Sequence, residues 1–327
     1  MAAPDSNVDV HLTRETFNLA GLLVHVWSNG GIQALSTKEL AAMILMHGWK
    51  ESTDDPALER TARAAFQWAL ARQQPVPVSA LQHDFLVVMF CKDDRTCGTT
   101  GIGRSTRAQT NDGAIILSTI TQHTRFGNAD RWSMERRIDI FGMLVGSARD
   151  VSFVIDFLPL YLFPHGERTI VEWAVAGTSL GAQAVWLVLK EEPRVRTGIA
   201  VIGSPNCIAV MRAMGAATGV PIAPPYVPDA LLALMRRLDP TSAAADCTAY
   251  NPYFGKQVLV VAAEQDVYMA WGAYAAFVEE MEVGPGGRKE VLRLPGGHCY
   301  TEEMMWALVR FFWEECVVGR RPGKAKL

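Results

Sequence analysis

The chain has 327 residues, 49% of them hydrophobic, and a formal net charge of −3. A chain of this length and apolar content can bury a large core, which predicts a single large domain with insertions or one domain with a small cap. The near-neutral charge without a long basic run argues against nucleic-acid binding, and no apolar segment is long enough to span a membrane.

Apolar runs and helical patterns alternate along the sequence. In the first half, the runs expected to form β-strands cover residues 8–12, 22–27, 41–48 and 85–90. Helical spacing covers 59–73 and 136–163. We expect the second helix to break near Gly146 and to end before Pro164.

In the second half, the expected strands cover 169–177, 197–204, 256–263 and 290–297. Their near-continuous hydrophobicity suits a parallel sheet that is covered on both faces. Helical patterns over 271–283 and 302–316 continue the alternation. The sequence therefore predicts an α/β fold with a mostly parallel central sheet and helices on both faces.

Three segments interrupt this alternation. Residues 99–134 are rich in Gly, Thr and Ser, which predicts a long loop insertion. Residues 205–254 are partly helical and punctuated by proline, and they follow a strand end, so we expect a lid or cap over the ligand crevice. A pair of ordinary peripheral helices is the alternative. Residues 319–327 form a basic segment that we expect to be a flexible tail.

The six cysteines are scattered, and none has the C-x-x-C spacing of a zinc site or a redox dithiol. We therefore expect reduced thiols in an intracellular, cytoplasmic protein, without a metal or other cofactor. Cys299 follows His298 directly, but adjacent side chains on an extended backbone point apart.

Ser179 lies in the pentapeptide Gly177-Thr178-Ser179-Leu180-Gly181, between an apolar run and a helical pattern. The G-x-S-x-G form is typical of a nucleophile elbow, in which a sharp strand-to-helix turn exposes the serine hydroxyl. Five residues also occur in this order by chance, and the serine could simply cap the helix.

A serine nucleophile needs a base, and the base needs an acid that fixes its tautomer. Asp266 and His298 each follow an expected strand, so both should lie with Ser179 at one edge of a parallel sheet. His298 is the candidate base because it lies in a glycine-flanked loop before the last helix. Glu264 is an alternative acid, and we favour Asp266 because it lies further into its loop.

The oxyanion that forms in acyl transfer needs backbone N–H donors. The residue after the nucleophile, Leu180, should supply one of them. Gly48 or Trp49, in the turn after the third expected strand, should supply the other. His47 in the same turn is expected to shape this loop.

Five separated motifs together resemble the α/β-hydrolase superfamily. They are the elbow at Ser179, the late acid in AEQDVYMAW, the GGHCY before the last helix, the MHGW turn, and the Asp93, Arg95 and Gly98 of FCKDDRTCG. The resemblance spans most of the chain and implies an α/β-hydrolase fold with a Ser179–His298–Asp266 triad. The long segment after Gly98 and the absence of an HGGG run depart from the family pattern.

The substrate expectation has two sources. Apolar residues in the segment PYVPDALLALM suggest a roomy pocket for a medium or long acyl chain, lined by Tyr226, Leu231 and Leu232. The segment 150–186 resembles fungal intracellular α/β-hydrolases, some of which release polyketide chains from carrier-protein thioesters. We therefore expect a thioesterase-like enzyme that hydrolyses or lactonises such a chain, presented by an acyl carrier protein. A general carboxylesterase and a non-catalytic binding module with this fold are the alternatives.

The last three residues, Ala325-Lys326-Leu327, resemble the S-K-L peroxisomal signal. A peroxisomal address is therefore a second expectation beside the cytoplasm, and a tail without a signal is its alternative.

Overall fold

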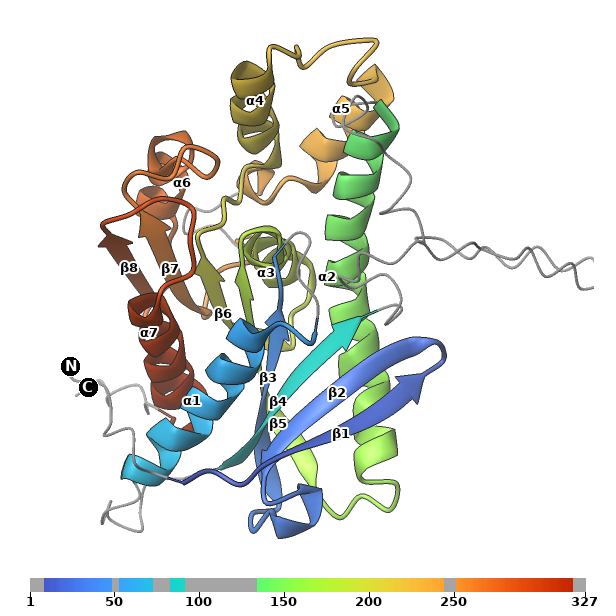
Figure 1. Ribbon diagram of the computed structural model, residues 1–327, viewed down its shortest axis with the longest axis vertical. Coiled ribbons are helices and arrows are strands. Elements are labelled where there is room, and N and C mark those ends of the chain that lie inside the picture. The colour runs from blue at the N-terminus through green and yellow to red at the C-terminus, as the bar shows by residue number, and fades with distance from the viewer. Residues whose placement is uncertain (1–8, 49–52, 73–82, 92–133, 244–250, 320–327) are drawn as a thin grey trace, which may run out of the picture.

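A computed structural model describes residues 9–48, 53–72, 83–91, 134–243 and 251–319 of the chain. These residues form one eight-stranded sheet with the order β1-β2-β4-β3-β5-β6-β7-β8 (Figure 1). The strands are β1 (Leu12–Leu19), β2 (Leu22–Asn29), β3 (Glu39–Met46), β4 (Asp84–Cys91), β5 (Thr169–Thr178), β6 (Val195–Val201), β7 (Gln257–Ala263) and β8 (Arg288–Leu294).

The sheet is antiparallel at one edge and parallel elsewhere. β2 pairs antiparallel with both β1 and β4, and every other neighbouring pair is parallel. The β1–β2 hairpin turns at Ala20 and Gly21, which both have positive φ and lie between the paired residues Leu19 and Leu22. Two positive-φ residues give the tight hairpin turn that matches strand twist.

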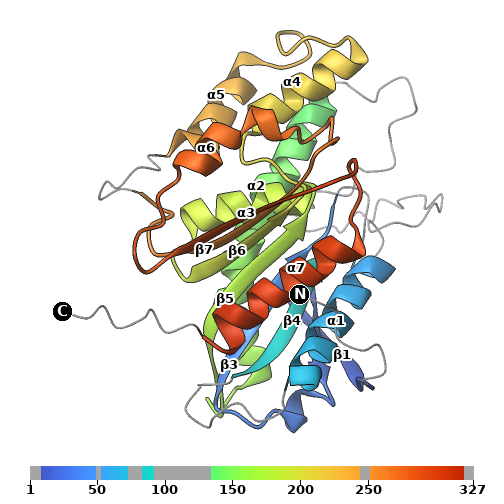
Figure 2. The same cartoon turned by 90° about the vertical axis from the view of Figure 1, so that its left-hand side faces the viewer.

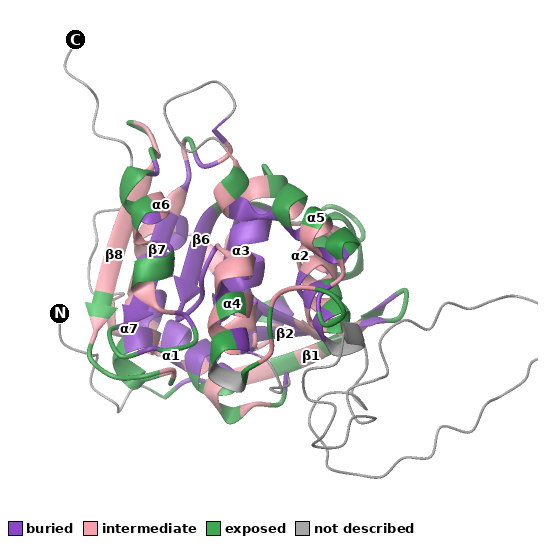
Figure 3. Cartoon of the chain, turned by 90° about the horizontal axis from the view of Figure 1, so that it is seen from above, coloured by how far each residue is buried: buried purple, intermediate pink, exposed green. Residues whose placement is uncertain are grey.

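Helices cover both faces of the sheet. α1 (Pro56–Arg72) and α7 (Glu302–Phe312) pack on one face, and α2 (Met134–Leu162) and α3 (Leu180–Glu191) pack on the other (Figure 2). Alternate residues of β3 enter the two core clusters, because side chains of a strand point to opposite faces in turn. Figure 3 shows the buried strands at the centre and exposed residues on the outer helix surfaces. The predicted α/β architecture is confirmed.

Two expected elements differ from the structure at the start and in the middle of the chain. The first strand is β1 at Leu12–Leu19 rather than 8–12, because the mixed polar sequence LTRETFNL suits an edge strand that pairs on one side only. α2 runs unbroken through Gly146 to Leu162. The expected break is wrong because buried residues on both sides of Gly146, among them Leu144 and Val151, pack one continuous face of the helix into the core.

The expected helix over 271–283 is shorter in the structure. It consists of a 3-10 turn at Trp271–Ala273 and α6 at Ala275–Glu280. The last helical pattern ends in a π-helical turn, Trp313–Val317, after α7. None of the described helices, α2 included, has both the length and the apolar character to cross a bilayer.

The expected lid segment contains α4 (Cys207–Thr218), α5 (Asp229–Leu238) and a 3-10 turn, Pro240–Ser242. α4 and α5 lie beyond the carboxyl ends of the parallel strands (Figures 1 and 2). Movement of this segment as a lid stays a prediction. The expected insertion over 99–134 and the tail over 319–327 lie outside the described residues, apart from Met134, which begins α2, and Gly319.

Candidate active site

Ser179 forms a one-residue turn between β5 and α3. β5 ends at Thr178 and α3 begins at Leu180, and Ser179 has φ 52° and ψ −112°. A residue other than glycine rarely adopts a positive φ, and such strain is concentrated at functional sites. The Ser179 N–H donates to the Val201 carbonyl of β6 at 3.0 Å, which ties the strained residue to the sheet.

The glycines of the elbow are required by close backbone contacts. A Cβ atom on Gly177 would lie 2.5 Å from the carbonyl carbon of Gly181. A Cβ atom on Gly181 would meet the carbonyl oxygen of Met46, at the end of β3. These contacts explain why glycines lie two residues before and two residues after the serine, because a side chain at either position would collide with backbone atoms.

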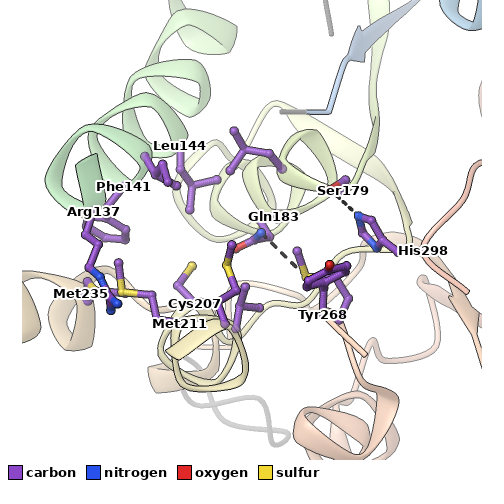
Figure 4. Close-up of a pocket in the computed structure, with 15 residues that line it drawn as sticks. Arg137, Phe141, Leu144, Ser179, Gln183, Cys207, Met211, Met235, Tyr268 and His298 are labelled. Atoms are coloured by element: carbon purple, nitrogen blue, oxygen red, sulfur yellow. Dashed lines mark hydrogen bonds between the residues drawn. The ribbon is translucent and has the colours of Figure 1, made fainter. Parts of the chain in front are cut away.

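His298 lies in the loop between β8 and α7 and faces Ser179. The distance between Ser179 Oγ and His298 Nε2 is 2.8 Å, and His298 Nδ1 lies 2.7 Å from Asp266 Oδ2 (Figure 4). The Tyr268 ring and the imidazole pack nearly at right angles, with a centroid distance of 5.6 Å. The structure thus joins three residues from three separate loops into one hydrogen-bonded chain.

Asp266 is buried in the loop after β7, with a side chain that is 1% exposed. Its Oδ1 accepts the backbone N–H groups of Tyr268 and Met269, each at 2.9 Å. Burial favours the neutral carboxyl, but the hydrogen bonds from His298, Met269 and Tyr268 outweigh it and hold the pKa of Asp266 below its ordinary value.

The ionised Asp266 determines the tautomer of His298. A carboxylate can only accept, so His298 Nδ1 carries the proton and Nε2 is left to accept the Ser179 hydroxyl proton. Glu264, the alternative acid, has a side chain that is 42% exposed and that pairs with Arg293 at 3.5 Å. The structure therefore brings Asp266, and not Glu264, to the imidazole.

Two of the expected oxyanion donors, Leu180 and Gly48, are among the described residues, and both lie beside the elbow. Leu180 is the first residue of α3, where backbone N–H groups have no partner within the helix and the helix dipole is positive. Gly48 follows β3, whose last residue Met46 is paired with Gly177. The His47 imidazole Nδ1 donates to the Gly48 carbonyl at 2.8 Å, consistent with a role in shaping this loop. Trp49 lies outside the described residues.

A cavity of about 300 Å³ opens at Ser179 and His298. Its walls come from α2, α3, α4 and α5 and from the loop after β7 (Figure 4). Most of the lining is apolar: Ile140, Phe141, Leu144, Leu180, Cys207, Val210, Met211, Met214, Met235, Tyr268 and Met269. An apolar cavity that ends at a serine–histidine pair can hold an acyl chain with its carbonyl at the hydroxyl.

Tyr226, Leu231 and Leu232, which the sequence suggested as substrate contacts, do not line this cavity. Leu231 is buried in the core, Leu232 packs against the core, and Tyr226 is 42% exposed. α5 presents Met235 to the cavity instead. The apolar sequence of this segment serves packing of the helix against the core as well as the cavity wall.

The contribution of α2 to the cavity was missed. The lining residues of α2 have the spacing i, i+3, i+4 and i+7, which places them on one face of the helix: Arg137, Ile140, Phe141 and Leu144. The sequence contains this pattern. It does not reveal that this face borders the serine, because that depends on how α2 packs over the sheet.

Within the described part of the chain, no group of three His, Cys, Asp or Glu side chains is placed to hold a metal ion. Three described cysteines are free thiols: Cys207, Cys299 and Cys316. Burial raises the pKa of the Cys207 thiol, which lines the cavity, so this sulfur stays neutral and acts as part of the apolar wall.

Comparison with protein-family models and with curated protein sequences finds no match. Many solved structures are similar. Acetyl xylan esterase 1 from Thermoanaerobacterium sp. has a TM-score of 0.51 at 13% identity, over 94% of this chain and 89% of that one. Est1E from Butyrivibrio proteoclasticus, with ferulic acid bound, has a TM-score of 0.51 at 15% identity, over 92% and 98% of the two chains.

Acylaminoacyl peptidase from Pyrococcus horikoshii has a TM-score of 0.54 at 12% identity, over 97% of this chain. This chain spans 43% of that peptidase. At such identities the similarity concerns the fold alone. Together with the strand order and the strand-to-helix turn at Ser179, it defines the class: the chain has the α/β-hydrolase fold.

Proposed function

We propose that this protein is a serine hydrolase that cleaves an acyl ester or thioester through an acyl-enzyme at Ser179. One observation carries the proposal. Ser179 Oγ, His298 and Asp266 form a continuous hydrogen-bonded chain at the mouth of an apolar cavity. A serine hydroxyl becomes a nucleophile when a correctly oriented base can take its proton, and this arrangement supplies both the base and its orientation.

The reaction has two halves. Ser179 Oγ attacks the acyl carbonyl carbon while its proton moves to His298 Nε2, and the carbonyl oxygen becomes an oxyanion. Leu180 N–H and an N–H at the end of β3 hold that oxyanion. The tetrahedral adduct collapses when the bond to the leaving alcohol or thiol breaks and His298 gives this group the proton. Water, deprotonated by His298, then releases the acyl group and regenerates the Ser179 hydroxyl.

We further propose that the acyl group is a medium or long chain delivered as a thioester on an acyl carrier protein. The apolar lining and the volume of the cavity favour such a chain over a short polar one. An internal hydroxyl of the chain would serve as acceptor in place of water and yield a lactone. The sequence resemblance to fungal intracellular hydrolases supports the thioester and polyketide assignments.

A general carboxylesterase is the second candidate function. One of the similar structures is acetyl xylan esterase 1, and the same hydrogen-bonded chain would act on an oxygen ester. A non-catalytic binding module is a third candidate, from a different class of protein. The intact chain from Ser179 to Asp266 argues against this third candidate, since binding alone requires no oriented base.

A matched substrate panel tests these candidates. The wild type and Ser179→Ala are each assayed with N-acetylcysteamine thioesters and with p-nitrophenyl esters. Both series carry the same acyl groups, from acetyl to decanoyl. We expect the highest kcat/KM for the longer thioesters and loss of turnover by several orders of magnitude in the variant. Preference for the oxygen esters would favour the carboxylesterase, and turnover that survives in Ser179→Ala would contradict the assigned nucleophile.

A further inference from the structure

Gln183 is a buried polar residue in the wall of the cavity. It is 6% exposed and lies near the start of α3, where its backbone N–H donates to the Ser179 carbonyl at 3.1 Å. Its side chain lines the cavity, and Figure 4 shows it between Ser179 and Arg137. Residues 184–189, which follow it on α3, are all buried and hydrophobic. Packing alone would therefore favour an apolar residue at this position, because it lies on a buried stretch of helix.

The side-chain amide of Gln183 is only partly satisfied. Its Nε2 donates to the Met269 sulfur at 3.9 Å, and a thioether sulfur is a weak acceptor. Because this sulfur can only accept, it keeps the nitrogen of the amide on its own side and leaves the oxygen on the other. Gln183 Oε1 accepts no hydrogen bond from the described residues and is not sealed off by them, so it is open to the cavity.

An open amide oxygen makes the cavity selective for its occupant. Buried polar groups in proteins are nearly always paired, and a buried acceptor without a partner is destabilising. A plain acyl chain would cover Gln183 Oε1 with methylene groups and leave it unpaired. A chain that presents a hydroxyl group at the same place would donate to this oxygen and remove the penalty.

The position of Gln183 determines which part of the chain it contacts. Gln183 lies one helical turn after Ser179, which corresponds to about 6 Å along the helix axis. The acyl carbonyl is held at the Ser179 hydroxyl in the proposed reaction. The amide therefore meets the carbons next to the reacting carbonyl, whereas the far end of the chain lies further along the apolar wall.

We infer that Gln183 is a specificity-determining residue, and that the preferred acyl chain carries a hydroxyl group close to its reacting carbonyl. This inference rests on the proposed function and specifies its substrate class. The hydroxyl donates its proton to Gln183 Oε1, and the remainder of the chain stays aliphatic to match the apolar lining.

A series of decanoyl thioesters of N-acetylcysteamine tests the inference. The series contains the plain chain and the chains with a hydroxyl group on the β, the δ or the ω carbon. The wild type should prefer the β- or the δ-hydroxy chain over the plain chain in kcat/KM. Gln183→Met should reduce this preference about tenfold or more, because methionine fills the space but is a weak acceptor. The ω-hydroxy chain should behave like the plain chain in both proteins.

Two controls separate recognition of the hydroxyl from a structural role. Gln33→Met makes the same chemical change at an exposed position outside the cavity and should keep the wild-type preference. Methylation of the substrate hydroxyl removes the donor without any change in the protein, and it should abolish the preference of the wild type. Uncatalysed ring closure of the δ-hydroxy thioester is measured without enzyme and subtracted.

Two results would overturn the inference. If Gln183 only supports Met269 and the loop that holds Asp266, Gln183→Met would slow all chains alike. If the oxygen binds no hydroxyl, the preference would be the same before and after Gln183→Met, or would survive methylation of the hydroxyl. The methylation result holds even if the variant does not fold.

A binding measurement separates this inference from the proposed catalytic function. Methyl octanoate and its β- and δ-hydroxy derivatives are titrated by calorimetry into Ser179→Ala protein, with Gln183 intact and with Gln183→Met. Intact Gln183 should bind one of the hydroxy esters about tenfold or more tightly than the Gln183→Met protein does. This preference together with inert substrates would retain the binding site and refute the hydrolase. Hydrolysis without any preference for the hydroxyl would retain the hydrolase and refute the role of Gln183.

Discussion

Each residue of the hydrogen-bonded chain has a different physical task. Ser179 is held in a strained conformation that exposes its hydroxyl, and His298 is 23% exposed and can exchange protons with substrate. Asp266 is almost fully buried and accepts three hydrogen bonds, from His298 and from two backbone N–H groups. The carboxylate therefore acts on the reaction by holding the imidazole, while the serine and the histidine contact the reacting atoms.

Asp266→Asn tests this division of tasks. The amide side chain can still accept the backbone N–H groups of Tyr268 and Met269, so the fold should persist. Its NH₂ group would face His298 Nδ1 and stabilise the tautomer that cannot accept the serine proton. We expect kcat to fall about 10⁴-fold with KM little changed. Glu264→Gln is the matched control, and it should keep wild-type kinetics; the opposite result would mean that Glu264 is the acid.

The lowered pKa of Asp266 predicts how stability varies with pH. The folded state binds this proton more weakly than the unfolded chain, in which the carboxyl has a pKa of about 3.9. Its contribution is therefore fully present above that value and is lost as the pH falls through the lower folded pKa. Urea unfolding of wild type and Asp266→Asn should show the difference in unfolding free energy shrinking below about pH 4. A difference that grows in acid would contradict the direction of the pKa shift.

Two close contacts between helices and strands position the site. The turn from β5 into α3 presses against the end of β3, and α2 lies over the sheet with one face toward the cavity. The first contact needs a glycine, and the second needs a helix that continues without a break from Arg137 to Leu158. Both are properties of packing between elements that are distant in sequence.

Gly181→Ala and Gly142→Ala should have opposite effects on stability. A Cβ atom at Gly181 would collide with the backbone of β3, which cannot move aside cheaply, so we expect a loss of about 1–3 kcal/mol. A Cβ atom at Gly142, an exposed position within α2, would meet nothing within 4 Å. That change should stabilise the helix by about 0.5–1 kcal/mol. Thermal unfolding measures both, and a tolerated alanine at Gly181 would contradict the tight turn.

Because α4 forms part of the cavity wall, we expect kcat/KM to depend on the length of the acyl chain. Met211 lines the cavity and is partly exposed, so Met211→Trp should fill part of the space for the acyl chain. We expect kcat/KM for decanoyl esters to fall about tenfold or more, while acetyl esters are affected little. Arg212→Trp, at an exposed neighbouring position that does not line the cavity, is the control. Equal losses on acetyl and decanoyl esters would mean that the cavity does not hold the chain.

Across the molecule, local sequence predicted the motif residues better than the surfaces around them. Ser179, Asp266 and His298 could be selected because each follows an apolar strand and lies in a loop with turn-forming residues. The strand order and the cavity could not be predicted from local sequence, since both depend on long-range packing. Arg137 is the clearest case, because nothing in its local sequence indicates that it is buried opposite the serine.

The position of the first strand could not be predicted from local hydrophobicity either. Residues 8–12 alternate between apolar and polar side chains, but the paired strand is Leu12–Leu19, whose register is set by the tight turn at Ala20 and Gly21. An edge strand with one exposed face carries only a weak apolar signal. The turn chemistry, rather than the hydrophobicity, would have located it.

We propose that Ser179 forms a covalent acyl-enzyme. The most direct test of this proposal is intact-protein mass spectrometry after incubation with a fluorophosphonate and, separately, with a decanoyl thioester, followed by peptide mapping of any adduct. We expect one adduct per chain, on Ser179, that is absent in Ser179→Ala and forms much more slowly in His298→Ala. An adduct on another residue, or none with either reagent in a folded wild-type protein, would contradict it.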